Sequence, residues 1–348
     1  MPDVLRGVAL LAMLIAHANH LLTSTPPGWR PLVFGNANDI ASPLFALVMG
    51  LSAQIVLQRT QPGQRGRMLL QQMARGAVLI LLGVWMSEWG SWVAVILSYL
   101  GLLLIVGVPL LLLSTRWVIG LALGLAVLSD PINAWAREVL GPLVWESPVL
   151  STISSWIVLG SNYRLTNLLP FFLLGAVLMR HGFRRDKYLW AMAVIAPVAY
   201  AVRPLWNAVV DGPEVPSGSL PDTLHDVGLV FGVFVVIVVL ATVTRPRPAR
   251  VIAIAFEPLR AIGAVALSLY LLHVAIIAIW VHTGWTVAVN EIVSWLILVP
   301  GMVVTGWLWW RYVGVGPIEW LLGWVTGRPK KWRELPATAR PPSRAARR

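Results

Sequence analysis

Residues 1–20 read MPDVLRGVALLAMLIAHANH, an apolar run in which Arg6 is followed after ten residues by His17. An apolar run of about 20 residues predicts a membrane-spanning helix. Ionisable side chains are costly in lipid, so they are rare there and usually mark a pathway or a reaction site. Arg6 and His17 lie roughly 16 Å apart along such a helix, about half the hydrocarbon thickness. One end of this helix could hold a molecule from the cytoplasm while its middle performs chemistry.

The composition of the whole chain is typical of a membrane protein with many spans. Of its 348 residues, 57% are hydrophobic and 12% are charged, whereas soluble domains carry about 25% charged residues. The chain has no cysteine, which excludes disulfides, thiol catalysis and cysteine-bound metals. We predict an all-α, polytopic integral membrane helix bundle with no metal site.

Hydropathic runs of about 20 residues predict about ten transmembrane helices, of which the fifth is short. The expected spans are residues 4–23, 40–58, 69–87, 92–113, 117–130, 164–180, 188–208, 227–244, 261–282 and 290–311. The alternate loops and ends on one side hold 23 Lys and Arg residues, and those on the other side hold 4. Because basic loops stay in the cytoplasm, both termini are expected there, with the chain in the cell (cytoplasmic) membrane. Topology thus explains the net charge of +12, and no nucleic-acid partner is expected.

The chain is expected to form one transmembrane domain, residues 1–327, followed by a basic, proline-rich cytoplasmic tail, residues 328–348. The tail composition favours disorder against anionic lipid. The first apolar run is short enough to resemble a secretory signal peptide. However, no basic region precedes it, and polar side chains interrupt the expected cleavage site, so a retained span is favoured.

Polar residues of the first two spans are candidates for a site near the outer half of the membrane. His17 and His20 are three residues apart and share a helix face. The structural alternative is that Arg6 reaches lipid phosphates and His20 lies in the interface. Asp39 precedes Pro43 by four residues, which is typical of a helix N-cap. Alternatively, Asp39 orients an imidazole of the first helix and raises its basicity.

The span at 261–282 carries three further candidates, Ser268, Tyr270 and His273, and is otherwise apolar all round, which is typical of a central helix. His273 lies near mid-membrane by residue count, where a hydrogen-bonded structural histidine is the alternative. Near the outer ends of later spans lie Arg203, His225 and Asp226. Each of these alone is more typical of an interface residue than of a catalyst.

Two sequence motifs resemble the acyltransferase-3 family of membrane acyltransferases. DVLRGVALLAMLIAH at 3–17 matches its arginine followed after ten residues by histidine, and ALSLYLLH at 266–273 resembles its late S-Y-x-x-Y-L-x-H helix. DIASPLFALVMG at 39–50, together with the first ten residues, resembles the heparan-α-glucosaminide N-acetyltransferase-like family and the YeiB-like bacterial membrane proteins. The run WRYVGVGPIEWLL at 310–322 resembles the end of the YeiB-like proteins.

These resemblances imply transfer of an acyl group from cytoplasmic acyl-CoA to a hydroxyl or amine of an outward-facing glycan or lipid acceptor. The acyl group is expected to be acetyl. In the second group of relatives the catalytic histidine lies before helix 2, but this chain has no histidine between residues 21 and 180. The expected general base is therefore His17, with Asp39 as orienting acid and His273 as a polar contributor. Arg6 and Arg75 are candidates for acyl-CoA binding, and the candidates for acceptor or oxyanion contacts are Asn19, His20, Ser268 and Tyr270.

Two other functions use the same polar residues. A transporter or flippase of a lipid-linked or small polar substrate would use them as a pathway, although the sequence shows no pair of matching broken helices. A non-catalytic relative would assist envelope assembly. Binding of acetyl-CoA or CoA discriminates the enzyme from the transporter.

Overall fold

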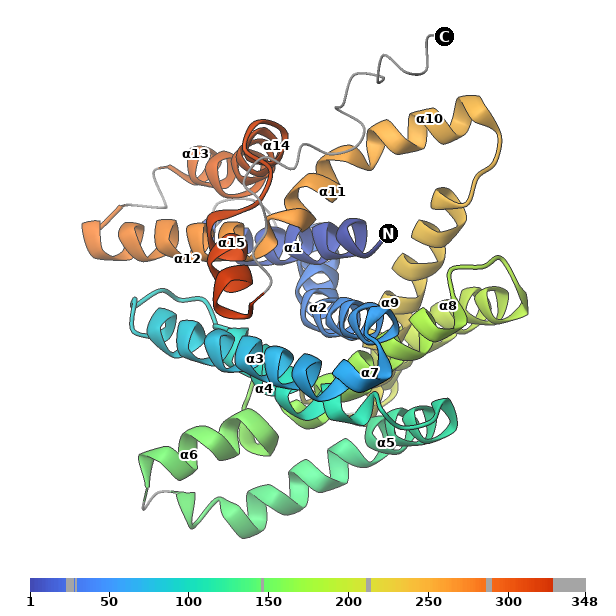
Figure 1. Cartoon of the computed structure of the whole chain (residues 1–348). Helices are drawn as coiled ribbons and strands as arrows, with labels where there is room; N and C mark the ends of the chain where they lie inside the picture. The colour runs from blue at the N-terminus through green and yellow to red at the C-terminus, as the bar shows by residue number, and fades with distance from the viewer. Residues whose placement is uncertain (23–27, 29, 145–146, 211–213, 286–289, 328–348) are drawn as a thin grey trace, which may run out of the picture.

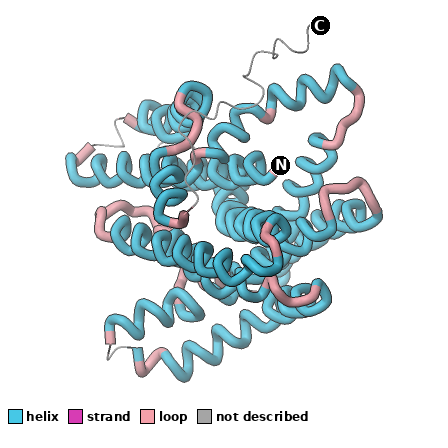
Figure 2. Tube along the Cα trace, viewed as in Figure 1, coloured by secondary structure: helices cyan, strands magenta, loops and turns pink. Residues whose placement is uncertain are grey.

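The computed structural model describes residues 1–22, 28, 30–144, 147–210, 214–285 and 290–327. Over these residues the chain forms helices joined by loops, with no strand (Figure 2). The expected all-α bundle is therefore confirmed. The expected tail, residues 328–348, lies outside the described residues.

The helices pack against one another in a bundle (Figure 1). They are α1 (Pro2–Ala18), α2 (Arg30–Arg59), α3 (Arg65–Ser87), α4 (Leu97–Leu110), α5 (Thr115–Leu140), α6 (Pro148–Ser154), α7 (Leu165–His181), α8 (Lys187–Val209), α9 (Leu220–Ala241), α10 (Pro246–Ala255), α11 (Glu257–Ala264), α12 (Ala266–Thr283), α13 (Glu291–Leu296), α14 (Met302–Tyr312) and α15 (Pro317–Val325). Two π-helical turns, Ser155–Leu159 and Ile297–Gly301, continue α6 and join α13 to α14.

Eight helical segments of the described chain are long and apolar enough to cross a membrane. Two of the ten expected spans fall on shorter apolar helices, α4 with 14 residues and α7 with 17. Each of the ten expected spans thus falls on a helix. A polytopic membrane bundle is the fold that these lengths and compositions support.

The second and fifth helices extend further than the sequence predicts. Helix α2 begins at Arg30 rather than at residue 40, so Asp39 lies inside the helix and is not an N-cap. The hydropathic pattern missed this part because it carries the polar residues Asn36, Asn38 and Asp39. Tyr200 contacts Asn36, Arg203 contacts Asp39, and Asn38 donates to its neighbour Asp39. Helix α5 likewise continues past Pro131 to Leu140, where an outer loop is expected.

Close helix approach near the first span depends on two glycines. A Cβ atom on Gly7 of α1 would lie 1.9 Å from the Leu259 carbonyl oxygen of α11, and one on Gly263 would lie 1.8 Å from the Asp3 carbonyl oxygen. No other residue fits at this spacing, so the two backbones pack directly. This contact fixes α11, and the start of α12 behind it, against α1.

Basic side chains tie several helix ends together at one end of the bundle, which we call the basic end. Arg6 of α1 donates to Ser52 of α2 at 3.0 Å and to the Gly263 carbonyl of α11 at 3.1 Å. Arg180 of α7 donates to the Leu111 and Leu113 carbonyls, where α4 ends. The opposite end, which holds Asp39 and Asp222, is called the acidic end.

Asp186 caps the N-terminus of α8 at the basic end, and its carboxylate accepts the N–H groups of Tyr188 and Leu189. Desolvation raises the pKa of this carboxyl, but the bonds from Leu189 and His181 outweigh it, so the pKa lies below its ordinary value. The bonds therefore stabilise the fold above the unfolded-state pKa of about 4 and stop doing so as the pH falls through the lowered value.

We expect Asp186→Ala to lower the melting temperature at pH 7 and to have a smaller effect below pH 4. Asp186→Asn keeps an oxygen for the cap and should retain more of the stability at pH 7. The melting temperatures of the purified wild-type protein and both variants, measured at pH 7 and at pH 3, test this expectation. An effect of Asp186→Ala that stays constant from pH 7 to pH 3 would contradict the capping role.

Candidate functional site

A cavity of about 140 Å³ lies toward the basic end of the bundle, between α2, α3, α4 and α12. Most of its wall is aliphatic. Polar atoms come from five residues, Arg6, Ser52, Gln72, Arg75 and Tyr270. Arg6 is fixed there by Ser52, by the Gly263 carbonyl and by an ion pair with Asp3 at 2.8 Å. The two expected acyl-CoA-binding arginines thus line one cavity whose wall is otherwise mostly apolar.

A larger cavity of about 510 Å³ lies toward the acidic end and has a more polar wall. His17 and His20 of the first span line it, as does Asp39 of α2. The other polar or aromatic wall residues are Asn38, Ser42, Trp92, Asn162, Tyr163, Arg164, Asn167, Phe171, Arg203, Ser217, Asp222, Thr223 and Asp226. Side chains that accept and donate hydrogen bonds thus surround this space, and three indole or imidazole rings, those of His17, His20 and Trp92, also line it.

Two stacked imidazoles connect the walls of the cavities. His17 Nδ1 lies 3.2 Å from His273 Nε2, and the rings are stacked with their centroids 5.3 Å apart. His273 is fully buried, and its ring meets the ring of Tyr270 edge-on at 5.1 Å. Since His17 lines the acidic-end cavity and Tyr270 lines the basic-end cavity, the three rings form a short path from one space to the other.

Non-helical backbone between α3 and α4 lies beside these rings. Val93 and Ala94 line the acidic-end cavity, whereas Ile96 and Leu97 line the basic-end cavity. Backbone groups without helical partners are tolerated at membrane depth only when protein or a cavity satisfies them. The Ile96 N–H meets this need by donating to the Tyr270 hydroxyl at 3.1 Å. This segment and Tyr270 together separate the two cavities.

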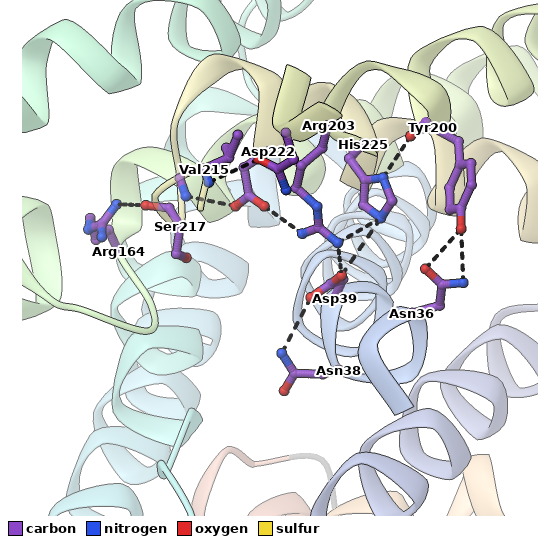
Figure 3. Close-up of polar contacts among 12 residues, drawn as sticks. Asn36, Asn38, Asp39, Arg164, Tyr200, Arg203, Val215, Ser217, Asp222 and His225 are labelled. Carbon is purple, nitrogen blue, oxygen red and sulfur yellow. Dashed lines mark hydrogen bonds and ion pairs between the residues drawn. The ribbon is translucent and has the colours of Figure 1, made fainter. Parts of the chain in front are cut away.

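Asp39 belongs to a charged cluster at the acidic end (Figure 3). Arg203 donates to Asp39 through Nη2 and to Asp222 at 2.8 Å through Nη1, and its Nη2 lies 3.0 Å from His225 Nε2. His225 Nε2 is also 3.7 Å from the Asp39 carboxylate. The structure therefore pairs Asp39 with Arg203 and places it beside His225, rather than against His17 as expected. The cause is the earlier start of α2, which moves Asp39 onto a helix face beside α8 and α9.

Asp226 has a different environment from its two acidic neighbours. It lines the same cavity, yet its buried Oδ1 atom has no hydrogen-bond partner among the described residues. Asp222, in contrast, also accepts from the Gly218 N–H at 2.8 Å. The cavity wall thus contains one carboxyl oxygen that has no hydrogen-bond partner among the described residues.

Arg164 and Tyr163 form another part of the acidic-end wall. Arg164 donates to the backbone carbonyls of Gly160, Ser161 and Ser217, so it holds the loop before α9 in place. Burial, and then the neighbouring Tyr99, raise the pKa of Tyr163 to about 12. The Tyr163 phenol therefore stays neutral at physiological pH and keeps a proton to donate.

The remaining sequence candidates are placed as follows. Asn19 is exposed and accepts from Arg30 at 3.2 Å. His20 lines the acidic-end cavity with its ring centroid 6.3 Å from that of Trp92. The Ser268 hydroxyl contacts Glu319 and the Ile318 N–H, and Ser268 is not among the residues that line either cavity. Among the described residues, no group of three or more His, Asp or Glu side chains is arranged to hold a metal ion.

A known family accounts for the helix that carries Arg6 and His17. A family model described as an acyltransferase domain matches residues 2–311. The chain belongs to the acyltransferase-3 family. This match spans α1 to the last residues of α14 and includes both histidines of the stacked pair. A comparison with curated proteins gives no match.

Membership of the acyltransferase-3 family supports the assignment of the chain as a membrane acyltransferase. An acyltransferase has two substrates, an acyl donor and an acceptor. The sequence pointed to both histidines but missed how Arg203, Asp222 and His225 share one cluster with Asp39. The sequence does place these ionisable residues on the same side of the membrane, near the outer ends of the expected spans. Their convergence depends on how α2, α8 and α9 pack, which periodicity alone does not give.

Proposed function

We propose that the protein transfers an acyl group, acetyl in the simplest case, from acyl-CoA at the basic end to an acceptor hydroxyl or amine at the acidic end. The observation that carries the proposal is the path of three rings, Tyr270, His273 and His17, between the two cavities. The donor then stays at one face of the membrane while the acceptor binds at the other. This opposite placement of the two substrates is the central claim.

The basic-end cavity suits the acyl-bearing arm of the donor. Its apolar interior accepts a thin chain, while Arg6 and Arg75 lie at a wall where phosphate oxygens could be bound. The basic end is also the expected cytoplasmic face, where acyl-CoA is made. An acyl group that reaches the inner limit of this cavity comes close to Tyr270 and the buried His273.

The histidine pair supplies the proton chemistry. In this mechanism the proton between His17 Nδ1 and His273 Nε2, which lie 3.2 Å apart, belongs to His17. Nε2 of His17 then carries the lone pair that can take a proton. For transfer, the acyl-bearing arm has to pass Tyr270 so that its thioester reaches His17. There the acceptor oxygen or nitrogen, entering from the acidic-end cavity, loses its proton to this Nε2 as it attacks the thioester carbonyl carbon, and the carbon–sulfur bond then breaks to release the CoA thiolate. His273 stabilises the resulting imidazolium through the same hydrogen bond, which is the role first assigned to Asp39.

The acidic-end cavity suits a sugar acceptor. Sugars present many hydroxyl groups and a flat apolar face, and the wall offers carboxylate, amide and guanidinium partners together with Trp92 and the His20 ring. Asp226 provides an acceptor oxygen that no residue of the described chain occupies. A glycan or a glycan-bearing lipid is therefore the favoured acceptor.

The direct test is transfer by the purified protein from acetyl-CoA to a panel of glucosamine, N-acetylglucosamine and their short oligomers. We expect CoA release that depends on a sugar, an acetylated sugar detected by mass spectrometry, and a higher melting temperature with CoA present. Arg75→Ala should raise the CoA concentration needed for a given increase in melting temperature by at least tenfold. Arg59→Ala, an exposed arginine of the same end outside the cavity, serves as the control.

No stabilisation by CoA and no acetylated product would contradict the proposal. A transporter or a non-catalytic envelope-assembly protein, the two alternatives from the sequence, would then account better for the polar cavities.

A further inference from the structure

The segment that follows α14 returns to the first turn of α12. Glu319 of α15 accepts hydrogen bonds from the Leu267 N–H at 2.7 Å and the Ser268 N–H at 3.3 Å through Oε1. Its Oε2 accepts from the Ser268 hydroxyl, and that hydroxyl in turn accepts from the Ile318 N–H at 3.0 Å. Four hydrogen bonds thus join residues that are about fifty positions apart in the chain.

These bonds satisfy backbone N–H groups that α12 cannot satisfy by itself, because the first N–H groups of a helix have no intrahelical partner. A carboxylate at this position also interacts favourably with the helix dipole. Most helix caps come from the residue just before the helix, which is Val265 here and has no side-chain cap bond. The cap of α12 comes instead from a distant segment, so that segment adds to the packing against α1 in holding the start of α12 in place.

The fit between the two segments leaves no free space. A Cβ atom on Gly316 would lie 2.1 Å from Glu319 Oε2 and 2.5 Å from Ser268 Oγ. A side chain at position 316 would therefore displace Glu319 or Ser268 from these contacts, so glycine here allows Glu319 and the Ile318 N–H to reach α12.

The residues attached to this cap are those of the proposed transfer path. Ala266 and Leu267 line the basic-end cavity, Tyr270 follows one turn later, and His273 follows Tyr270. Helix α15 also contacts α3, which contributes Gln72 and Arg75 to the same cavity (Figure 1). The segment therefore bridges two walls of the cavity near the basic end.

We propose that Glu319 is a positioning residue for acyl transfer, holding α12 at the height and rotation at which His273 meets His17. This inference rests on the proposed function. Loss of the cap lets the first turns of α12 shift, which changes the geometry of the histidine pair although Glu319 touches neither substrate. Such a change alters the rate and the pH dependence of transfer in protein that is still folded.

The test compares Glu319→Ala, Glu319→Gln and Glu257→Ala in the acetyl-CoA and sugar assay, with rates expressed per folded protein. Glu319→Ala should lower kcat about tenfold and shift the pH profile of kcat. Glu319→Gln can accept a hydrogen bond from the Leu267 N–H and donate one to the Ser268 hydroxyl. This variant should therefore recover most of the wild-type kcat and most of its pH profile. Glu257 also lies in the first turn of a helix and contacts Trp307 and Arg311 away from both cavities, so its variant should keep kcat and its pH profile.

Should Glu319→Ala fail to fold, Ser268→Ala removes two of the same contacts and is expected to shift the pH profile in the same direction. Wild-type kcat and pH profile in the folded Glu319 and Ser268 variants would overturn the positioning role while leaving the transfer reaction intact. Absence of transfer in the wild-type protein, in contrast, would remove the proposed function itself and this inference with it.

Discussion

Replacement of His17 by alanine is expected to lower the rate of acyl transfer by about 10²–10⁴-fold, the range typical of a lost general base. His17 is the member of the stacked pair that lines the acidic-end cavity, and its Nδ1 is occupied by His273. Only its second ring nitrogen remains to take the proton of an acceptor. Because His17 is not part of the basic-end cavity, stabilisation by CoA should be retained.

The rate of sugar-dependent CoA release by the purified variant measures this effect. His282→Ala is the matched control, since His282 lies on α12 like His273 but nine residues further along, outside both cavities, and contacts the Ala278 carbonyl. We expect that variant to keep transfer within about twofold. Full transfer by His17→Ala would exclude His17 as the base, and loss of CoA binding in the same variant would place its role at the donor site instead.

Replacement of Arg203 by alanine is expected to have the largest effect on stability, about 2–3 kcal/mol. Arg203 joins Asp39 of α2 to Asp222 of α9, and its removal leaves two largely buried carboxylates without their partner. Breaking a fully buried pair costs about 3–5 kcal/mol. We expect less here because the side chain of Arg203 is 23% exposed and the three charged residues line the acidic-end cavity, and exposed charge pairs contribute less than buried ones.

Chemical unfolding in detergent measures the free energy, and a double-mutant cycle isolates the pair. Asp39→Asn in the Arg203→Ala background should recover part of the lost stability, because it removes one of the uncompensated charges. Arg203→Lys should be intermediate, since lysine keeps the charge but not the two-pronged geometry. A loss below about 0.5 kcal/mol for Arg203→Ala would show that the cluster contributes little to the fold.

The first helix shows how far the sequence alone reaches. Its length, its charge spacing and its resemblance to the acyltransferase-3 family all follow from residues 1–20, and the family is confirmed. The pairing of His17 with His273 could be anticipated only as two polar residues in apolar helices. Their 3.2 Å contact depends on the packing of α1, α11 and α12, which glycine contacts set across distant parts of the chain.

Asp39 shows where sequence reasoning is limited. Hydropathy places the start of the second span at the first long apolar run, but a helix can begin earlier when its polar face has partners elsewhere in the fold. Arg203 and Tyr200 are those partners, and they lie more than 160 residues away. Glu319 is a similar case, because a capping residue is usually sought just before its helix.

The side of the membrane on which each substrate must be supplied tests the central claim most directly. Proteoliposomes can hold the protein in known orientation, with labelled acetyl-CoA on one side and an impermeant sugar on the other. The account predicts labelled sugar only when acetyl-CoA faces the basic end and the sugar faces the acidic end. Equal transfer with both substrates supplied only at the basic end would contradict it.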